Sequence, residues 1–303
     1  MGTLKTEKLI EFLREQHPEL SKQTFRVISS GHQNLIIVLG ERLIFRFPLT
    51  SDLTSLKLEE RLLPQLGKRL PLPIPQFRYV SLSKQNIHYV GYPIIPGESL
   101  EAGKLNSLNE PTRRLFAKQI AEFLTSLHTF TGDPITRVDR RRFQAEWRRN
   151  WSGYYRAVEL NVFPKIGKKE RTWIMQVFDD YLYLSEHFKF TPSLIHGDFK
   201  NDHILYDPQA GRLTGVIDFG QMKMGDPSYD YHDLCISYGE PFARAVLNEY
   251  KGPVDPTFLE RCSAFYANIL RFSSMIIAAQ TKNESKFKLR HEWLKQKARD
   301  ADL

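Results

Sequence analysis

The sequence predicts an α+β fold of two lobes, in which a small antiparallel β lobe with one helix precedes a larger, mostly helical lobe. Short strand-like runs separated by turn residues dominate the first third of the chain, whereas helical spacing of apolar residues dominates the rest. A chain of 303 residues is also long for one compact unit and suits two lobes that share a cleft. We place the boundary near Ile95, so that the lobes comprise residues 1–95 and 96–303.

The first lobe is predicted to contain a β-meander followed by a helix and two more strands. An amphipathic helix in residues 4–19 leads into three strand-like runs in residues 24–48. Residues 52–69 return to helical spacing, with Asp52 as the expected N-cap. After a proline-rich stretch, two further strand-like runs lead to the boundary. This order predicts a five-stranded sheet.

The second lobe is predicted to be helical with one β interruption. Residues 115–127 place Leu, Phe and Ile on one face of a long helix, and residues 140–187 continue with an aromatic-rich helical pattern. Residues 194–218 contain two brief apolar runs joined by Pro208 to Gly211, which indicate a hairpin. The second lobe therefore carries a short hairpin among its helices.

The composition favours a cytoplasmic globular protein. Apolar residues make up 41% and charged residues 26% of the chain, close to ordinary soluble proteins. Cys235 and Cys262 are too few for a disulfide framework, so a reducing compartment is the simpler interpretation. The first residues carry a charge every few positions, which argues against a signal peptide or membrane span.

The charge balance predicts neither a nucleic-acid nor a membrane partner. A net charge of +8, from 43 basic and 35 acidic residues, is a modest excess spread along the chain. Residues 137–149 hold six arginines with Phe143 and Trp147. A solvated helix face over buried aromatic residues is favoured there over a surface for an anionic substrate.

The densest chemical signal lies in the segment Ser193–Asp230. Asp198 follows an apolar run, where an exposed carboxylate can accept the proton of a substrate alcohol, and is the predicted catalytic base. His203 stands five residues later and is a candidate ligand for a divalent ion, although Mg²⁺ prefers oxygen. Asp218 begins an Asp-Phe-Gly triplet like the one whose carboxylate holds the metal in protein kinases, and is the predicted principal Mg²⁺ ligand.

Each of these residues also has a structural interpretation. Asp198 would cap a turn, His203 would be a hydrogen-bonded core histidine, and Asp218 would close a hairpin. For a lone residue the structural interpretation is the stronger. Their order and spacing together favour the functional one.

This segment resembles the signature of aminoglycoside phosphotransferases and related antibiotic kinases. The matching residues are His196-Gly197-Asp198, His203, Ile217-Asp218-Phe219-Gly220, Gly225-Asp226-Pro227 and Asp230. Most of that broad family carries Asn at the place of His203, whereas the 2″-aminoglycoside and macrolide phosphotransferases resemble this chain in having His. The resemblance implies a protein-kinase-like fold and a Mg²⁺-dependent transfer of phosphate from ATP or GTP to a hydroxyl group.

The resemblance also implies a nucleotide site in the first lobe. It would be formed by Arg46, Glu59, Ser30, Gly31, Asn34, Pro93 and Ile95. Arg46 stands where the family has a strand lysine that contacts the phosphates, and Glu59 is its expected partner, with Glu60 as the competing register. Pro93 and Ile95 occupy the hinge, whose backbone groups would read the purine edge.

The acceptor is expected to be an aminoglycoside, whose positive charges would be bound by Asp230, Asp233 and Glu240. A macrolide or an endogenous metabolite alcohol is the alternative. A macrolide would need a wide apolar groove, for which the candidates are Phe242, Tyr266, Phe272, Met275 and Trp293.

An alternative from a different functional class is a pseudokinase, which keeps the kinase fold and binds nucleotide but does not catalyse phosphoryl transfer. Arg46 in the place of the lysine is its support, whereas Asp198 and Asp218 argue against it. We expect a monomer whose partners are a nucleoside triphosphate and a small-molecule alcohol.

Overall fold

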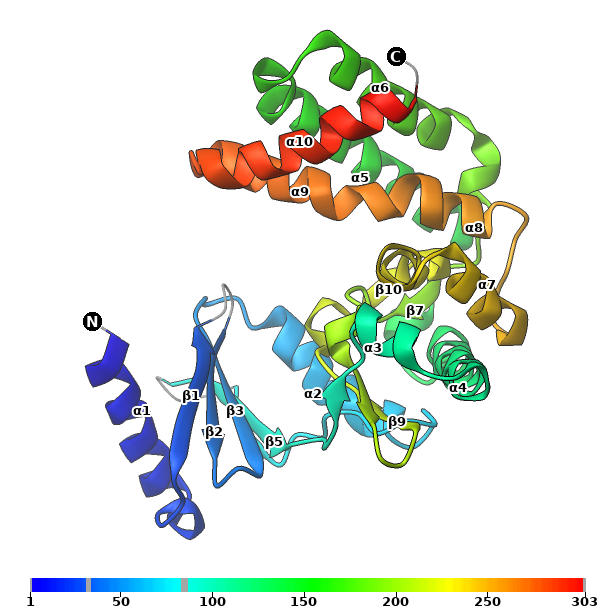
Figure 1. Ribbon diagram of the computed structural model, residues 1–303. Helices are drawn as coiled ribbons and strands as arrows, with labels where there is room; N and C mark the ends of the chain where they lie inside the picture. The colour runs from blue at the N-terminus through cyan, green and yellow to red at the C-terminus, as the bar shows by residue number, and fades with distance from the viewer. Residues whose placement is uncertain (1, 31–33, 83–86, 302–303) are drawn as a thin grey trace.

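The computed structural model describes residues 2–30, 34–82 and 87–301 and confirms the α+β arrangement of a sheet lobe and a helical lobe (Figure 1). Five antiparallel strands form the sheet of the small lobe in the order β1-β2-β3-β5-β4. Their bounds are β1 (Phe25–Ser30), β2 (Asn34–Leu39), β3 (Leu43–Pro48), β4 (Tyr79–Ser81) and β5 (Tyr89–Pro93). The predicted meander and the two later strands are thus all present.

The two faces of this sheet are covered by different helices. Alternate side chains of a strand point to opposite faces, and Phe45 and Phe47 of β3 pack in one apolar cluster with Ile10 and Leu13 of α1 (Gly2–Gln16). Arg46, between the two phenylalanines, therefore points to the other face, where α2 (Thr54–Leu66) lies. Because side chains alternate along β3, the positively charged side chain of Arg46 points toward α2.

The observed α2 is shorter than the predicted segment of residues 52–69. The N-cap position is Leu53 instead of Asp52, although Asp52 Oδ1 still accepts the Thr54 N–H at 2.9 Å. Pro64 lies inside the helix, and Gly67 ends it by donating its N–H to the Leu63 carbonyl at 2.8 Å. Because the N-cap is Leu53 and not Asp52, α2 begins one residue later than predicted.

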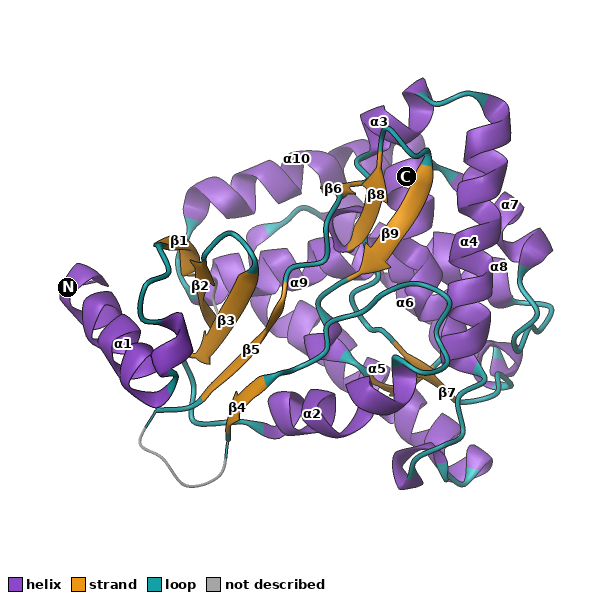
Figure 2. Ribbon diagram, turned by 90° about the horizontal axis from the view of Figure 1, so that it is seen from below, coloured by secondary structure: helices purple, strands orange, loops and turns teal. Residues whose placement is uncertain are grey.

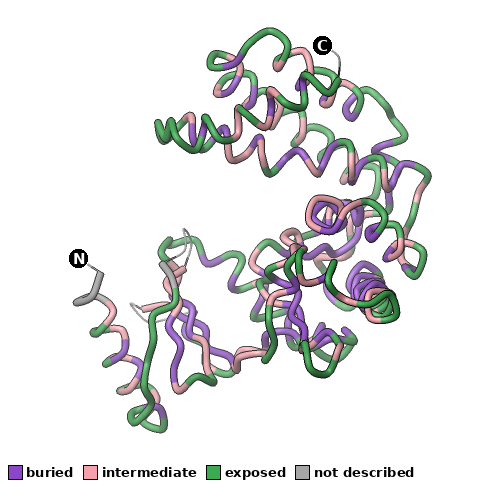
Figure 3. Tube along the Cα trace, in the orientation of Figure 1, coloured by how far each residue is buried: buried purple, intermediate pink, exposed green. Residues whose placement is uncertain are grey.

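Helices form most of the second lobe, and several begin at a side-chain cap. Asn109 caps α4, Asp139 caps α5 and Asn283 caps α10, each by accepting a backbone N–H of the first turn. The bounds are α3 (Ala102–Ser107), α4 (Glu110–His128), α5 (Arg140–Asn161), α6 (Lys168–Tyr183), α7 (Glu240–Glu249), α8 (Phe258–Glu260), α9 (Ala267–Gln280) and α10 (Glu284–Asp300). Buried residues gather inside both lobes (Figure 3).

Two small sheets place the predicted catalytic segment. The hairpin of β8 (Ile204–Asp207) and β9 (Arg212–Val216) pairs with β6 (Glu98–Ser99), and it lies beside α3 and α4 (Figure 2). This hairpin confirms the sequence prediction. The second sheet joins β7 (Ser193–Ile195) to β10 (Lys223–Gly225) and was not predicted. It brings the residues after position 195 next to those before position 223.

The packing of the second lobe accounts for an arginine-rich segment and for a long apolar stretch. The arginines of residues 137–149 are exposed on and just before α5 while Trp147 is buried, which agrees with the solvated helix face. The stretch Phe258–Gln280 is long and apolar enough to span a membrane by length and composition. Phe265, Phe272 and Met275 of this stretch pack in the apolar core of the second lobe, as in the core helix of a globular protein.

Candidate active site

The loop after β7 carries the predicted catalytic base, Asp198, and is shaped by Gly197. Gly197 has a φ of +79°, and a Cβ atom there would lie 2.3 Å from the carbonyl oxygen of Gln221. Glycine alone meets both conditions without strain. This close approach brings the loop that carries Asp198 against the turn that follows Asp218.

Asp230 holds the same loop from the interior, which corrects the prediction that it lines the acceptor pocket. Its carboxylate is fully buried and accepts the N–H of His196 at 2.7 Å and that of Gly197 at 2.9 Å. Nε2 of His128 lies 3.1 Å from Oδ2. Burial alone would raise the pKa of Asp230, but His128 and the backbone donors hold this pKa below its ordinary value. Asp230 therefore positions the catalytic loop and does not face a substrate.

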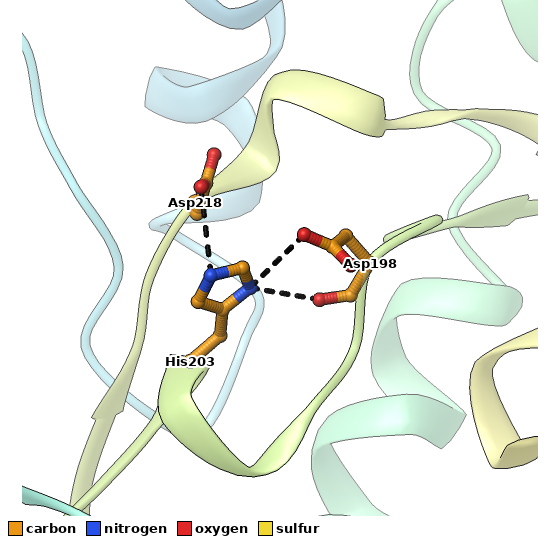
Figure 4. Close-up of side chains that lie close together, drawn as sticks. All are labelled: Asp198, His203 and Asp218. Carbon is orange, nitrogen blue, oxygen red and sulfur yellow. Dashed lines mark hydrogen bonds and ion pairs between the residues drawn. The ribbon is translucent and has the colours of Figure 1, made fainter. Parts of the chain in front are cut away.

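His203 lies between Asp198, the predicted catalytic base, and Asp218, the predicted metal ligand (Figure 4). Its Nδ1 lies 2.8 Å from the carbonyl oxygen of Asp198 and 3.5 Å from the carboxylate of the same residue. Because a carbonyl oxygen only accepts, Nδ1 carries a proton, so that in the neutral ring Nε2 offers its lone pair. That lone pair is directed toward Asp218, whose Oδ2 lies 3.5 Å from Nε2.

Asp218 adopts a left-handed backbone with a φ of +66°, a conformation that is concentrated at functional sites. Burial works to raise the pKa of Asp218, but His203 when protonated, the charge of Arg46 and the Gly220 N–H outweigh it, so this pKa lies below its ordinary value. One ligand atom each from Asp198, His203 and Asp218 all lie within 4.8 Å of one another. Two carboxylates and an imidazole this close together fit a divalent cation.

Arg46 and Glu59 form a buried bidentate ion pair. Nη1 lies 2.9 Å from Oε2 and Nη2 lies 3.1 Å from Oε1, and both side chains are almost completely buried. Burial opposes the charge of Arg46, but the carboxylate of Glu59 outweighs it and raises the pKa of the guanidinium. Glu60 is exposed, so the predicted pairing with Glu59 is confirmed and the competing register is wrong.

This ion pair lies close to the Asp218 turn. A Cβ atom on Gly220 would lie 3.7 Å from Arg46 Nη2, 3.8 Å from Glu59 Oε1 and 3.3 Å from Asp218 Oδ1. A cation of the small lobe is thus placed beside the candidate metal ligand of the large lobe. This juxtaposition is what a site for a metal-bound polyphosphate requires.

A cavity of about 520 Å³ opens beside these residues, and its lining includes Asn34, Arg46, Gly220 and Lys223. Two predicted nucleotide-binding residues, Asn34 at the start of β2 and Arg46, therefore share one cavity. Ser30 ends β1. Gly31 lies outside the described residues.

The predicted hinge residues line a different cavity. Pro93 ends β5 and, with Ile95, lines a hollow of about 580 Å³ that also contacts Pro73 and Thr214. The N–H of Ile94 donates to the Arg42 carbonyl at 2.8 Å. The backbone contact between hinge and purine stays a prediction.

Lys200 is a further charged residue of the site that the sequence reasoning missed. Its Nζ lies 3.2 Å from Asp198 Oδ2 and 3.9 Å from Asp202 Oδ2. Burial works to lower the pKa of Lys200, but the charges of Asp198 and Asp202 outweigh it and raise this pKa. The available signal was its position two residues after the predicted base.

The other two carboxylates predicted for the acceptor are also engaged. Asp233 is buried, and its Oδ2 accepts the Asn201 N–H at 3.1 Å and the Ser237 hydroxyl at 2.9 Å. Glu240 begins α7, which packs on α4, and pairs with Arg244 one turn later. The contacts of Asp233 correct its assignment as a substrate ligand, because this buried carboxylate anchors the catalytic loop. Glu240 is exposed and pairs with a neighbour on its own helix, so its contact with the acceptor stays a prediction.

The residues proposed for a macrolide groove are mostly core residues. Four of them are buried, namely Phe242, Tyr266, Phe272 and Met275, whereas Trp293 is partly exposed. Buried side chains of this kind stabilise the helical lobe. They do not form an open apolar groove.

The fold and the site together define the class of two-lobed proteins with a protein-kinase-like fold. The family model described as the phosphotransferase enzyme family, APH, matches residues 24–261, more than half of the chain. The chain therefore belongs to the phosphotransferase enzyme family, which confirms the resemblance found in the sequence.

Solved structures match nearly the whole chain. The GDP and kanamycin complex of APH(2″)-IIia superposes with a TM-score of 0.85 and 27% identity, covering 97% of this chain and 99% of the other. Macrolide 2′-phosphotransferase MphH from Brachybacterium faecium gives a TM-score of 0.72 at 18% identity, covering 95% and 98%, and at that identity shares the fold alone.

Curated relatives match part of the chain. Viomycin phosphotransferase from Streptomyces vinaceus is 26% identical over 204 residues, which are 66% of this chain and 66% of that protein. An uncharacterized protein of Bacillus subtilis, YcbJ, is 33% identical over 92 residues, which are 30% of this chain and 27% of that protein. The aligned regions span less than two thirds of the length of these relatives.

Proposed function

We propose that the protein is a Mg²⁺-dependent kinase that transfers the γ-phosphate of ATP or GTP to a hydroxyl group of a small molecule. The convergence of Asp198, His203 and Asp218 beside the buried pair of Arg46 and Glu59 carries this proposal. These residues come from both lobes and have the charges that phosphoryl transfer needs.

Asp198 is the group that orients and deprotonates the acceptor hydroxyl. Its carboxylate is partly exposed, unlike those of Asp230 and Asp233, and it stands next to the candidate metal ligands. A hydroxyl that donates to Asp198 has its oxygen lone pair free for attack on phosphorus. The proton passes to Asp198 as the new oxygen–phosphorus bond forms.

The phosphate end of the nucleotide is bound by cations from both lobes. His203 Nε2 and the carboxylate of Asp218 would hold Mg²⁺, which supplies positive charge to the phosphate oxygens. Arg46 lies beside Asp218 and adds a fixed guanidinium, whose N–H groups not used by Glu59 can donate to phosphate. Lys200, 3.2 Å from Asp198, brings an ammonium to the place where the phosphoryl group meets the acceptor.

The similar structures support a purine donor and an antibiotic acceptor. One of them holds GDP and kanamycin, a second above 25% identity holds GDP, and a more distant one holds ADP. An aminoglycoside is therefore the first acceptor class to assay, and the macrolide enzymes of the same fold make macrolides the second.

Nucleotide turnover by the purified protein tests the proposal. We expect Mg²⁺-dependent release of nucleoside diphosphate from ATP or GTP, and a loss of at least ~10²-fold in kcat for Asp198→Asn, because the base is removed. Asp180→Asn, an exposed aspartate of α6, is the matched control and should keep wild-type turnover.

The same assay separates the kinase from a pseudokinase. A protein that binds nucleotide in a thermal-shift experiment but shows no turnover with any acceptor, and no difference between wild type and Asp198→Asn, would contradict the proposal. Such a result would assign the chain a nucleotide-binding role.

A further inference from the structure

A third cavity lies between α5 and β10, the strand that pairs with β7 just before the catalytic loop. It has a volume of about 370 Å³, within the range of small-molecule sites. Trp147, Trp151 and Tyr154 line it from α5, and Lys223 and Met224 line it from β10. The three aromatic residues share one helix face because they are four and three residues apart. The cavity offers flat apolar walls with one ammonium group.

Tyr229 packs against residues that line this cavity. Its ring contacts Trp147 and Trp151, with centroid distances of 6.5 and 6.4 Å. Burial, followed by the charges of Asp230 and Asp198, raises the pKa of Tyr229 to about 12. β10 lines the cavity and pairs with β7, and the residues directly after β7 lead to Asp198, so the cavity adjoins the strand pair that carries the base.

Lys223 is the residue common to this cavity and to the cavity that contains Arg46. Its ammonium is accessible and lies 5.4 Å from the centroid of the Tyr229 ring. No carboxylate within the described ranges 2–30, 34–82 and 87–301 forms an ion pair with it. A lysine without an anionic partner, in a cleft where surrounding protein partly desolvates it, is suited to bind an anion.

The acidic groups that would attract a polycation are missing from this place. Asp230 and Asp233 are buried and hydrogen-bonded to the catalytic loop, and Glu240 pairs with Arg244 on α7. Among the described residues that line the cavity, Glu146 is the one carboxylate, and it is exposed. An aminoglycoside carries several positive charges, so one rim carboxylate opposite a lysine is a poor match.

The neighbouring helices add positive charge. The guanidinium of Arg271 on α9 lies 4.8 Å from the Trp293 ring, and Nε of Arg290 donates to the Ser274 hydroxyl at 3.3 Å. Burial, and then the charge of Arg290, lower the pKa of Arg271, while the charge of Asp233 opposes this. Arg271 lies on α9, the helix that packs against α5.

We propose that the cavity between α5 and β10 is the acceptor site and takes an alcohol with a planar, apolar body and one anionic group, a carboxylate or phosphate, held by Lys223. This inference rests on the proposed kinase function and narrows its acceptor class. The acceptor oxygen attacks the γ-phosphorus, the bond from that phosphorus to the β–γ bridging oxygen breaks, and nucleoside diphosphate leaves. The hydroxyl proton passes to Asp198 and then to solvent.

Three acceptors that differ in charge test the proposal: 4-(hydroxymethyl)benzoate, its methyl ester, and kanamycin. We expect kcat/KM for the benzoate to exceed that for the ester by about tenfold or more, because a charge-assisted hydrogen bond is lost in the ester. Lys223→Met should remove this difference, and Lys223→Glu should reverse it. Lys118→Met, an exposed lysine of α4, is the matched control.

Binding measured by quenching of tryptophan fluorescence gives a second readout that needs no turnover. The benzoate should quench with a lower Kd than the ester in wild type and with equal Kd in Lys223→Met. Equal or tighter binding of kanamycin, unchanged by Lys223→Met, would overturn the acceptor class, and so would quenching by none of the three.

The two proposals fail in different ways. Loss of all phosphoryl transfer, with Lys223-dependent binding of the benzoate intact, would contradict the kinase function and leave the anion site standing. If the protein phosphorylates kanamycin with Mg²⁺ and the rate is unchanged in Lys223→Met, the kinase function would stand. The proposal of an anionic acceptor would be contradicted.

Discussion

At the scale of single residues, Arg46 stands where the family resemblance implies a lysine, and this changes the geometry of the ion pair with Glu59. A guanidinium offers two parallel donors to a carboxylate, and Glu59 uses both at 2.9 and 3.1 Å. An ammonium at this position forms one such contact at a time. The ion pair is therefore a rigid element of the small lobe as well as a candidate phosphate ligand.

The first prediction concerns this pair. Arg46→Ala should lower the free energy of unfolding by about 3–5 kcal/mol, because it leaves the buried Glu59 carboxylate without a partner. Chemical denaturation measures the loss. The double variant Arg46→Met/Glu59→Leu should recover most of the stability without recovering nucleotide turnover. Equal stability of Arg46→Ala and wild type would contradict the structural role.

Gly197 provides the second prediction at this scale. Gly197→Ala should reduce kcat by at least ~10-fold and lower Tm, since its Cβ would lie 2.3 Å from the Gln221 carbonyl and φ is +79°. Gly211→Ala is the matched control, because Gly211 also has a positive φ, +59°, but no atom within 4 Å of an added Cβ. A similar effect of both variants would show that backbone strain alone, and not the close approach, is responsible.

At the scale of secondary-structure elements, the active site depends on two short strands. β7 and β10 are three residues each, and their pairing sets the loop that carries Asp198 against the turn that follows Asp218. Asp230 completes this arrangement by accepting two N–H groups from the residues that follow β7. The buried carboxylate of Asp230 thus anchors the loop that carries the carboxylate of Asp198.

The third prediction follows from the low pKa of Asp230. A carboxyl whose pKa is lower in the folded protein than its ordinary value of 3.8 stabilises the fold above that value, and the contribution is lost as pH falls through the folded pKa. Asp230→Asn should therefore cost about 2–4 kcal/mol at pH 7, with the difference from wild type narrowing below pH ~4.

The stability of both proteins as a function of pH, measured by urea unfolding, checks this expectation. Asp207→Asn is the control, because Asp207 is a hairpin-turn residue whose carboxylate accepts exposed backbone N–H groups, and the substitution should change stability by less than about 1 kcal/mol. A pH-independent difference for Asp230→Asn would argue against ionisation as its cause.

At the scale of the whole molecule, the candidate site is divided between the lobes. Arg46, Glu59 and Asn34 belong to the small lobe, whereas Asp198, His203 and Asp218 belong to the large one (Figure 1). A ligand that contacts both sets binds the folded arrangement alone and therefore raises Tm by mass action.

The fourth prediction uses this linkage. ATP or GTP with Mg²⁺ at about 100 times Kd should stabilise the protein by about 2.7 kcal/mol. Chelation of the metal by EDTA, or the substitution Asp218→Asn, should remove most of this effect in a thermal-shift experiment. Full stabilisation by nucleotide in EDTA would show that Asp218 does not act through a metal.

The sequence by itself determined the class of fold, the hairpin of β8 and β9, and the order of Asp198, His203 and Asp218. It placed the partner of Arg46 at Glu59, with Glu60 as the competing register that only the structure excluded. Strand alternation, helical spacing and short motifs are local properties, so they can be read along the chain.

The tertiary structure alone decided which carboxylates are free. Asp230 and Asp233 have the residue type expected of polycation ligands, but the pairing of β7 with β10 and the π-helical turn after Asp233 use them to anchor the catalytic loop. Likewise, Lys200 and Lys223 became functional candidates only when their distances to Asp198 and Tyr229 were known. Burial and partnership depend on contacts between residues far apart in the chain, which no local pattern specifies.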